Sequence, residues 1–226
     1  RGKLAIRGAD LSSEAAFMAA TLDSGIEINF AKIVLSEIEF KRSEDCEGES
    51  EDENEFEIEG PFIVDLIDNT ETPSLSTFDL PNESYCRLEM KMDQLEEDER
   101  PAGVAADDEI VGKSLLIQGR TAEDVEFVFE LDRDEEFRLE NLEDGFLTTD
   151  EVRSFLVIFD FSQWFNGVDF SGADDIEGVI YLNEDSNEEI FNLILGNIKN
   201  SSRLREDKDD DGELDDDEDD DLAEGS

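Results

Sequence analysis

Short runs of alternating apolar and polar residues, separated by turn residues, are the feature of this sequence that most limits its fold. In the stretch VEFVFELD, Phe127 and Phe129 fall on one face of an extended chain, and Glu126 and Glu130 fall on the other. Comparable β-branched or aromatic runs occupy residues 3–8, 25–30, 31–41, 62–67, 85–92, 113–120, 136–140 and 153–161. The pattern predicts a protein built mainly from β-strands.

The segments between these runs carry turn residues rather than helical patterns. Pro73, Pro81 and Pro101 each stand in a short polar stretch. Many strands with short polar connections are typical of antiparallel sandwiches and barrels. We therefore expect residues 1–170 to form an antiparallel β-sandwich of immunoglobulin-like or transthyretin-like type.

A short helix is expected after this domain, within residues 171–205. Ser186 has a Glu three residues later, which is the spacing of a capping box. Ile190, Ile194 and Ile198 then recur at helical spacing and predict one apolar stripe. We expect an irregular segment followed by a helix of about three turns, packed on the sandwich.

The charge of the chain restricts its partners. It has 66 acidic and 18 basic residues and a net charge of −48; without residues 206–226, 52 acids and 17 bases still leave −35. Such a surface repels nucleic acid and anionic membranes and favours cations, cationic partners or a salty medium. No apolar run approaches the ~20 residues of a membrane span, so we expect no transmembrane segment. Salt adaptation of a halophilic protein explains the same acidity and does not exclude calcium.

The acidic segment 206–226 contains a pattern typical of calcium loops. Residues 207–218, DKDDDGELDDDE, match D-x-[DN]-x-[DN]-G-x5-E, with Gly212 at the turn. Calcium takes six to eight oxygen ligands. The ligands that the pattern predicts are Asp207, Asp209, Asp211, Glu213 through its carbonyl, Asp215 and Glu218. The alternative is a disordered polyanion that matches through its composition; in both cases we expect residues 219–226 to be a frayed tail.

Histidine and cysteine usage exclude some chemistry and suggest a compartment. The chain has no His, which excludes Ser-His-Asp and Cys-His catalysis and the usual zinc sites. A disulfide between Cys46 and Cys86 would tie the acidic loop 44–59 to a strand and stabilise by about 4 kcal/mol, whereas the alternative is two unpaired thiols. A disulfide indicates an oxidising, extracytoplasmic location. The start at Arg1 rather than Met fits a mature exported protein or an excised fragment.

Several short motifs resemble a known family. They are SEIEF, IVDLI, DLPNESY and GKSLLIQG, at residues 36–40, 63–67, 79–85 and 112–119. Together they are similar to uncharacterised β-sandwich domains of unknown function in bacterial secreted lipoproteins. The resemblance implies an exported sandwich, held at the cell surface by a lipid anchor upstream, and it brings no catalytic residues.

These expectations combine into one functional hypothesis and two alternatives. We expect a secreted or cell-surface, non-enzymatic protein that binds calcium and serves adhesion, a surface layer or a fibre. The edge strand at residues 3–8 is expected to pair with a neighbouring subunit. One alternative is a carbohydrate-binding module in which Trp164 stacks on a sugar. The other is a salt-adapted hydrolase with two catalytic carboxylates. The sequence does not indicate which two of the 66 acids would form that pair.

Overall fold

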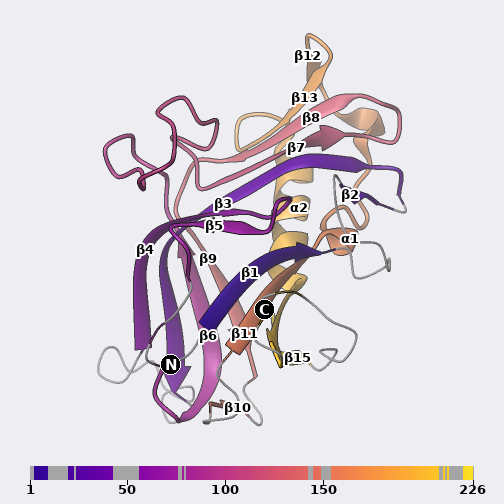
Figure 1. The fold of residues 1–226 in the computed structure, drawn as a ribbon. Coiled ribbons are helices and arrows are strands. Elements are labelled where there is room, and N and C mark those ends of the chain that lie inside the picture. The colour runs from indigo at the N-terminus through magenta and orange to yellow at the C-terminus, as the bar shows by residue number, and fades with distance from the viewer. Residues whose placement is uncertain are drawn as a thin grey trace.

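The fold is mainly β (Figure 1). The computed structural model describes residues 3–9, 20–22, 24–42, 56–75, 78, 80–141, 145–148, 154–208, 211, 213 and 221–225. Among them, the strands form one large mixed, mostly antiparallel sheet, accompanied by the short helices α1 (Phe161–Trp164) and α2 (Glu188–Asn200). The mainly β expectation is therefore confirmed, whereas the pairing does not show a particular type of sandwich.

The sheet runs in the order β1-β11-β14-β15-β9-β6-β3-β7-β8-β13-β12, and β4 pairs with both β3 and β5. Two further short strands, β2 and β10, pair with β3 and β6. The strands are β1 (Lys3–Ala9), β2 (Ala20–Thr21), β3 (Glu27–Arg42), β4 (Phe56–Asp65), β5 (Thr70–Thr72), β6 (Ser84–Met92), β7 (Leu115–Arg120), β8 (Glu126–Leu131), β9 (Glu135–Glu140), β10 (Phe146–Leu147), β11 (Ser154–Asp160), β12 (Asp175–Ile176), β13 (Val179–Leu182), β14 (Ser202–Glu206) and β15 (Asp221–Gly225).

The long strand β3 divides the sheet into two halves. Its first part pairs with β7 and its second part with β6, while β4 follows the opposite edge. The registers with β4 and β6 both shift between Leu35 and Glu37, so Ser36 is the extra residue of a bulge. Bulges bend a strand, and Figure 1 shows β3 turning sharply here. A Cβ on Gly60 would lie 2.3 Å from the Leu35 carbonyl oxygen, so the bend requires glycine beside it.

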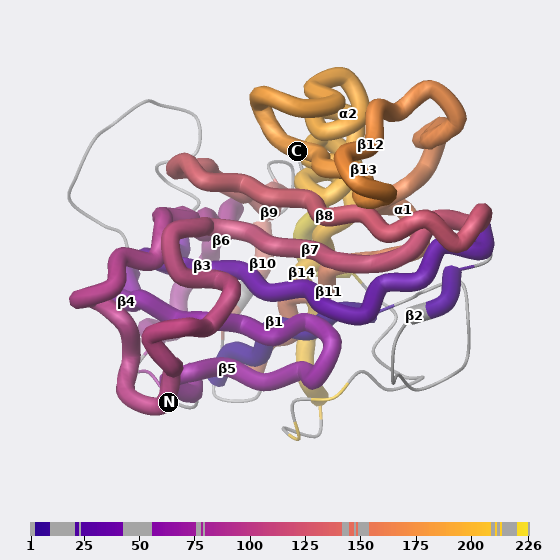
Figure 2. The backbone as a smooth tube through the Cα atoms, turned by 90° about the horizontal axis from the view of Figure 1, so that it is seen from above, coloured from indigo at the N-terminus to yellow at the C-terminus, as the bar shows by residue number. Residues whose placement is uncertain are grey.

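On one side of β3 lies the β7 half, which consists of β7, β8, β13 and β12. On the other side lies the β6 half, which consists of β6, β9, β15, β14, β11 and β1. In Figure 2, β3, β7 and β8 run side by side, and Figure 1 shows α2 crossing behind them. Phe129 of β8 stacks on Phe191 of α2, with ring centroids 4.9 Å apart. Phe40 of β3 contacts the rings of Tyr85 and Phe155, so the same core reaches into the β6 half.

Helix α2 confirms the predicted helix, but not its predicted cap. Phe191, Ile194, Leu195 and Ile198 are buried, as the apolar stripe requires. The residue before the first turn is Asn187, in the left-handed conformation with a φ of 53°, and its side chain makes no capping hydrogen bond. The capping box at Ser186 is therefore wrong, because Asn187 takes the cap position.

Strand β1 lies at an edge of the sheet, parallel to β11, yet its outer side is partly occupied. The amide of Ile6 donates to Glu71 Oε1 at 3.1 Å, and the amide of Gly8 donates to Asn69 Oδ1 at 2.9 Å. Both acceptors come from the β4–β5 turn and β5. A neighbouring subunit that paired with residues 3–8 would first have to displace these side chains.

The C-terminal part of the chain contributes strands to the same sheet. Strand β14 follows α2 and pairs with β11 and β15, so a strand, not the helix, leads into the acidic segment. Strand β15 lies between β14 and β9. The expectation of a frayed tail is wrong for residues 221–225, because pairing on both sides places them inside the sheet.

Candidate functional site

The predicted calcium loop is the connection of a β-hairpin. Strands β14 and β15 are antiparallel neighbours in which Leu204 stands opposite Ala223. Both side chains are buried in the core, with exposed fractions of 0% and 3%. Residues 207–220 therefore leave the sheet at one strand and return to it at the next.

This hairpin connection carries a high charge density. Residues 207–220 contain 11 acids and one Lys, a net charge of −10. At its base the Nε atom of Arg205 lies 2.6 Å from Oδ1 of Asp221, and Nε of Arg203 lies 3.6 Å from Oδ2 of the same carboxylate. The alternation Ser202, Arg203, Leu204, Arg205 was the available signal for this strand.

Three of the six predicted ligands lie among the described residues. Asp207 is buried, and its amide donates to the Ser154 carbonyl at 2.9 Å, which prolongs the contact of β14 with β11. Asp211 and Glu213 are exposed, and the Glu213 amide donates to Asp211 Oδ1 at 2.7 Å, as in an Asx turn. The other predicted ligands, Asp209, Asp215 and Glu218, lie outside the described residues. Within the described ranges no cluster of three or more metal-ligating side chains occurs, so the calcium site stays a prediction.

Trp164, the predicted sugar-stacking residue, is fully buried at the end of α1. Its ring packs edge-on against Phe161, with centroids 4.5 Å apart. The indole Nε1 is buried, and among the described residues it has no hydrogen-bond partner. A ring with no exposed face cannot stack on a sugar from solvent, so the geometry gives no support to a carbohydrate site at this residue.

Only one cysteine of the predicted disulfide, Cys86, lies among the described residues. Cys86 is buried in β6, and its sulfur lies 3.5 Å from the carbonyl oxygen of Arg42, the last residue of β3. Cys46 lies outside the described residues, as does most of the acidic loop 44–59, and follows Arg42 by only four residues. The described part of the chain contains no free cysteine. The pairing of Cys46 with Cys86 stays a prediction.

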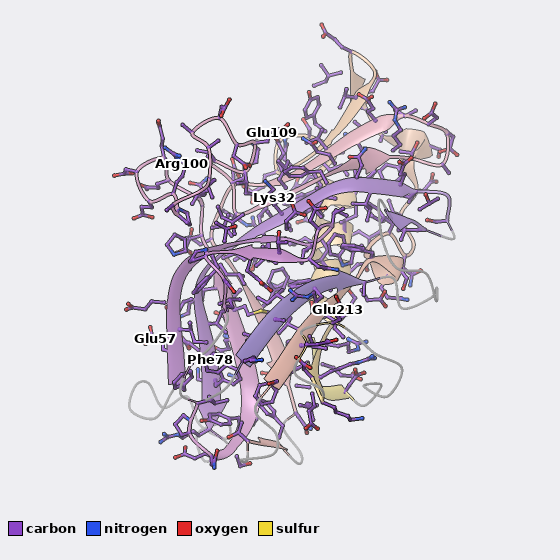
Figure 3. The ribbon with its side chains drawn as sticks, viewed as in Figure 1. Lys32, Glu57, Phe78, Arg100, Glu109 and Glu213 are labelled. Atoms are coloured by element: carbon purple, nitrogen blue, oxygen red, sulfur yellow. The ribbon has the colours of Figure 1, made fainter. Side chains whose placement is uncertain are left out.

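A lattice of charged side chains, which sequence reasoning missed, covers one face of β6, β9, β15, β14 and the second part of β3. This outer face is turned away from the core. Its charged residues are Glu37, Glu39, Lys41, Arg87, Glu89, Lys91, Glu136, Arg138, Glu140, Arg203, Arg205, Asp221 and Glu224. Strand β4 borders this outer face, and Glu57 projects from it into solvent (Figure 3). Alternation in β6 and β9 indicated polar faces, but not that long-range strand pairing would align their charges.

Two glutamates in this lattice are buried. Glu39 and Glu89 stand opposite each other on β3 and β6, with exposed fractions of 6% and 3%. Burial raises the pKa of Glu39, and the neighbouring Glu37 carboxyl adds to the shift, while Lys91 opposes it. The hydrogen bond to Glu39 in turn raises the pKa of Lys91. Arg87 Nη1 donates to Glu89 at 2.9 Å.

A polar pocket of about 310 Å³ lies beside the end of β8. Its acidic lining residues are Glu130, Asp132, Glu184 and Asp185. A second pocket, of about 380 Å³, lies beside the β3 bulge and has Asp93 and Glu99 in its wall. Glu39, whose pKa is raised, lines neither of these two pockets.

Comparison with protein-family models, with curated proteins and with solved structures finds no match to this chain. The resemblance to lipoprotein β-sandwich domains thus stays a prediction. Within the described part of the chain, no helix has the length and apolar character needed to cross a membrane.

Proposed function

We propose that this chain is a secreted or cell-surface, non-enzymatic structural protein that binds calcium in the hairpin connection 207–220. The ligands are Asp207, Asp209, Asp211, Glu213, Asp215 and Glu218. One observation carries the proposal: the acidic connection joins two neighbouring strands inside the sheet.

The hairpin supports ion binding because its ends are already held together. Antiparallel neighbours have Cα atoms about 4.5 to 5.5 Å apart, so closure of the loop costs no further chain entropy when an ion binds. A divalent ion also reduces the repulsion within a segment of charge −10. A single loop without a second, paired loop belongs with the weaker extracellular sites, with a dissociation constant of roughly 10⁻⁴ to 10⁻³ M.

Ion binding should strengthen the docking of β15. This strand has register partners in β14 for three residues and in β9 for two. Repulsion among the carboxylates of the connection pulls against these few contacts, and calcium relieves it. The ion then closes the sheet between β14 and β9, which is a structural role.

The exported location and the assembly role have separate support. The position of Cys86 beside the end of β3 fits a disulfide with Cys46, and such bonds persist in oxidising compartments. The two halves of the sheet enclose one core, as the layers of a sandwich do, and the resemblance to lipoprotein domains agrees with such a module. Adhesion, a surface layer or a fibre remain the uses that fit a rigid acidic domain.

Calorimetric titration of the full chain with calcium tests the site. We expect one weak site in the wild type, and its heat should disappear in Asp211→Ala and Glu218→Gln. Asp98→Ala removes an acid from an exposed turn elsewhere and should leave the titration unchanged. If all three variants lose heat in proportion to the charge removed, the segment is a diffuse polyanion and the proposal fails.

A further inference from the structure

The outer face of β6, β9, β15, β14 and the second part of β3 differs from the remainder of the protein in its charge balance. Its 13 charged residues comprise six bases and seven acids, a net charge of −1. The other charged residues, 59 acids and 12 bases, carry −47. Two copies of the chain therefore repel each other in most orientations, but not when these outer faces meet.

The charges of β6 and β9 form an alternating pattern. The register places Arg87 opposite Glu140, and at the other end it places Lys91 opposite Glu136. Between these pairs, Glu89 stands opposite Arg138, with the charges reversed. The sign of charge thus alternates along each strand and also across the pair.

This pattern is complementary to itself. A two-fold axis parallel to the strands, between β6 and β9, places β6 of one copy over β9 of the other. Arg87 then lies over Glu140 of the second copy, and Lys91 lies over Glu136. Arg138 lies over Glu89, which keeps only 4% of its side-chain surface exposed. The flanking strands β3 and β15 add a further pair of opposite charges. Lys41 of β3 and Glu224 of β15 lie in the same cross-strand row as Arg87 and Glu140, and the same rotation places Lys41 over Glu224 of the second copy.

We infer that the outer face of β6 and β9 is a contact surface for a second copy of this chain, related by that two-fold axis. Isologous dimers are the commonest oligomers, and a self-complementary pattern needs no other partner. Two side chains of the pattern are available to a partner, since Lys91 and Arg138 keep 40% and 48% of their side-chain surface exposed. The inference does not depend on calcium.

The contact should be weak. Three rows of side chains across β3, β6 and β9 cover on the order of 300 Å² per copy, less than half of the ~800 Å² typical of a stable interface. Most of these side chains already have ion-pair partners in their own chain, which limits the gain from new pairs. We therefore expect a dimer that forms only at high protein concentration.

Sedimentation equilibrium of the full chain, in EDTA and about 0.15 M salt, tests this. We expect the mean mass to rise from 25.5 kDa towards twice that value as the concentration increases. Arg138→Glu replaces one of the two exposed cations of this surface by an acid and should weaken dimerisation at least tenfold. Arg120→Glu, on β7 in the other half, makes the same change in net charge at an exposed site and should leave dimerisation unchanged.

Circular dichroism shows whether each variant folds. If Arg138→Glu does not fold, Arg138→Gln removes the charge with less strain and should still weaken the dimer severalfold. A wild-type mass that stays at 25.5 kDa at every concentration overturns the inference. An equal effect of Arg138→Glu and Arg120→Glu also overturns it, because general repulsion then explains the loss.

Discussion

Arg205 and Asp221 join the two ends of the acidic hairpin: Nε of the arginine lies 2.6 Å from Oδ1 of the carboxylate. Arg205 stands opposite Asp221 in the register of β14 and β15, and its side chain is only 10% exposed. The pair thus joins the two strands at the base of a connection of net charge −10.

Replacement of Arg205 should loosen β15. Arg205→Ala removes a charge-assisted hydrogen bond and leaves Asp221 with the longer contact to Arg203, so we expect a loss of about 1 to 3 kcal/mol in the free energy of unfolding. Urea unfolding measures the loss. Arg120→Ala removes a more exposed ion pair and serves as the control, for which little change is expected.

Strand β15 approaches the end of α2 closely at Gly225, and this contact can be tested. A Cβ on Gly225 would lie 2.0 Å from the carbonyl oxygen of Lys199, whereas a Cβ on Gly172 would meet no atom within 4 Å. Gly225→Ala should therefore displace β15 and accelerate amide hydrogen exchange at Ala223. The matched change Gly172→Ala should leave that exchange rate as it is. Equal rates in both variants would show that β15 is not seated against α2.

The sequence predicted much of the sheet because most strands carry their own apolar pattern. The run at 125–132 became β8, with Phe127 and Phe129 buried as expected. Two predicted strands, at 25–30 and 31–41, proved to be one bent strand, β3. The bend at Ser36 could not be predicted, because a bulge is defined by the register of its neighbours β4 and β6.

The candidate sites were harder to predict because they depend on long-range pairing. Strand β15 has only Leu222 and Ala223 as apolar residues in an acidic tract, and its place in the sheet is defined by β14 and β9. Trp164 also depends on tertiary contacts. The carbohydrate-binding alternative needs an exposed ring, whereas packing against Phe161 buries it.

Lys32 and Asp108 make the stability of the long β6–β7 connection depend on pH. Lys32 Nζ donates to both oxygens of Asp108, at 2.9 and 3.2 Å. Although burial works against it, the hydrogen bond from Lys32 lowers the pKa of Asp108 below its ordinary 3.8. The pair therefore stabilises the fold above pH 3.8, and this contribution is lost as the pH falls through the lowered pKa.

Lys32→Met should cost about 1 kcal/mol at neutral pH, and the cost should shrink below pH 3.8. Denaturant titrations of wild type and variant at several pH values measure the difference. Asp108→Asn should remove the same pH dependence of stability. The double variant should show the same pH dependence as Asp108→Asn alone. A cost of Lys32→Met that does not change with pH would rule out this coupling.

For Glu39 we expect the opposite dependence of stability on pH. Its pKa in the folded protein is raised above 4.5, chiefly by burial, so its contribution to stability is complete below pH 4.5 and is lost as the pH rises through the raised pKa. Glu39→Gln lacks this titration. Relative to wild type, the variant should gain stability between acidic and neutral pH; a constant difference in the free energy of unfolding across that range would contradict the assignment.

Amide hydrogen exchange of Ala223 in β15, with and without calcium at constant ionic strength, tests the central claim most directly. If calcium binds within 207–220 and holds the hairpin, millimolar calcium should slow exchange at Ala223 at least tenfold, and Glu218→Gln should abolish the effect. Exchange that responds equally to calcium and to sodium at equal ionic strength would contradict the claim.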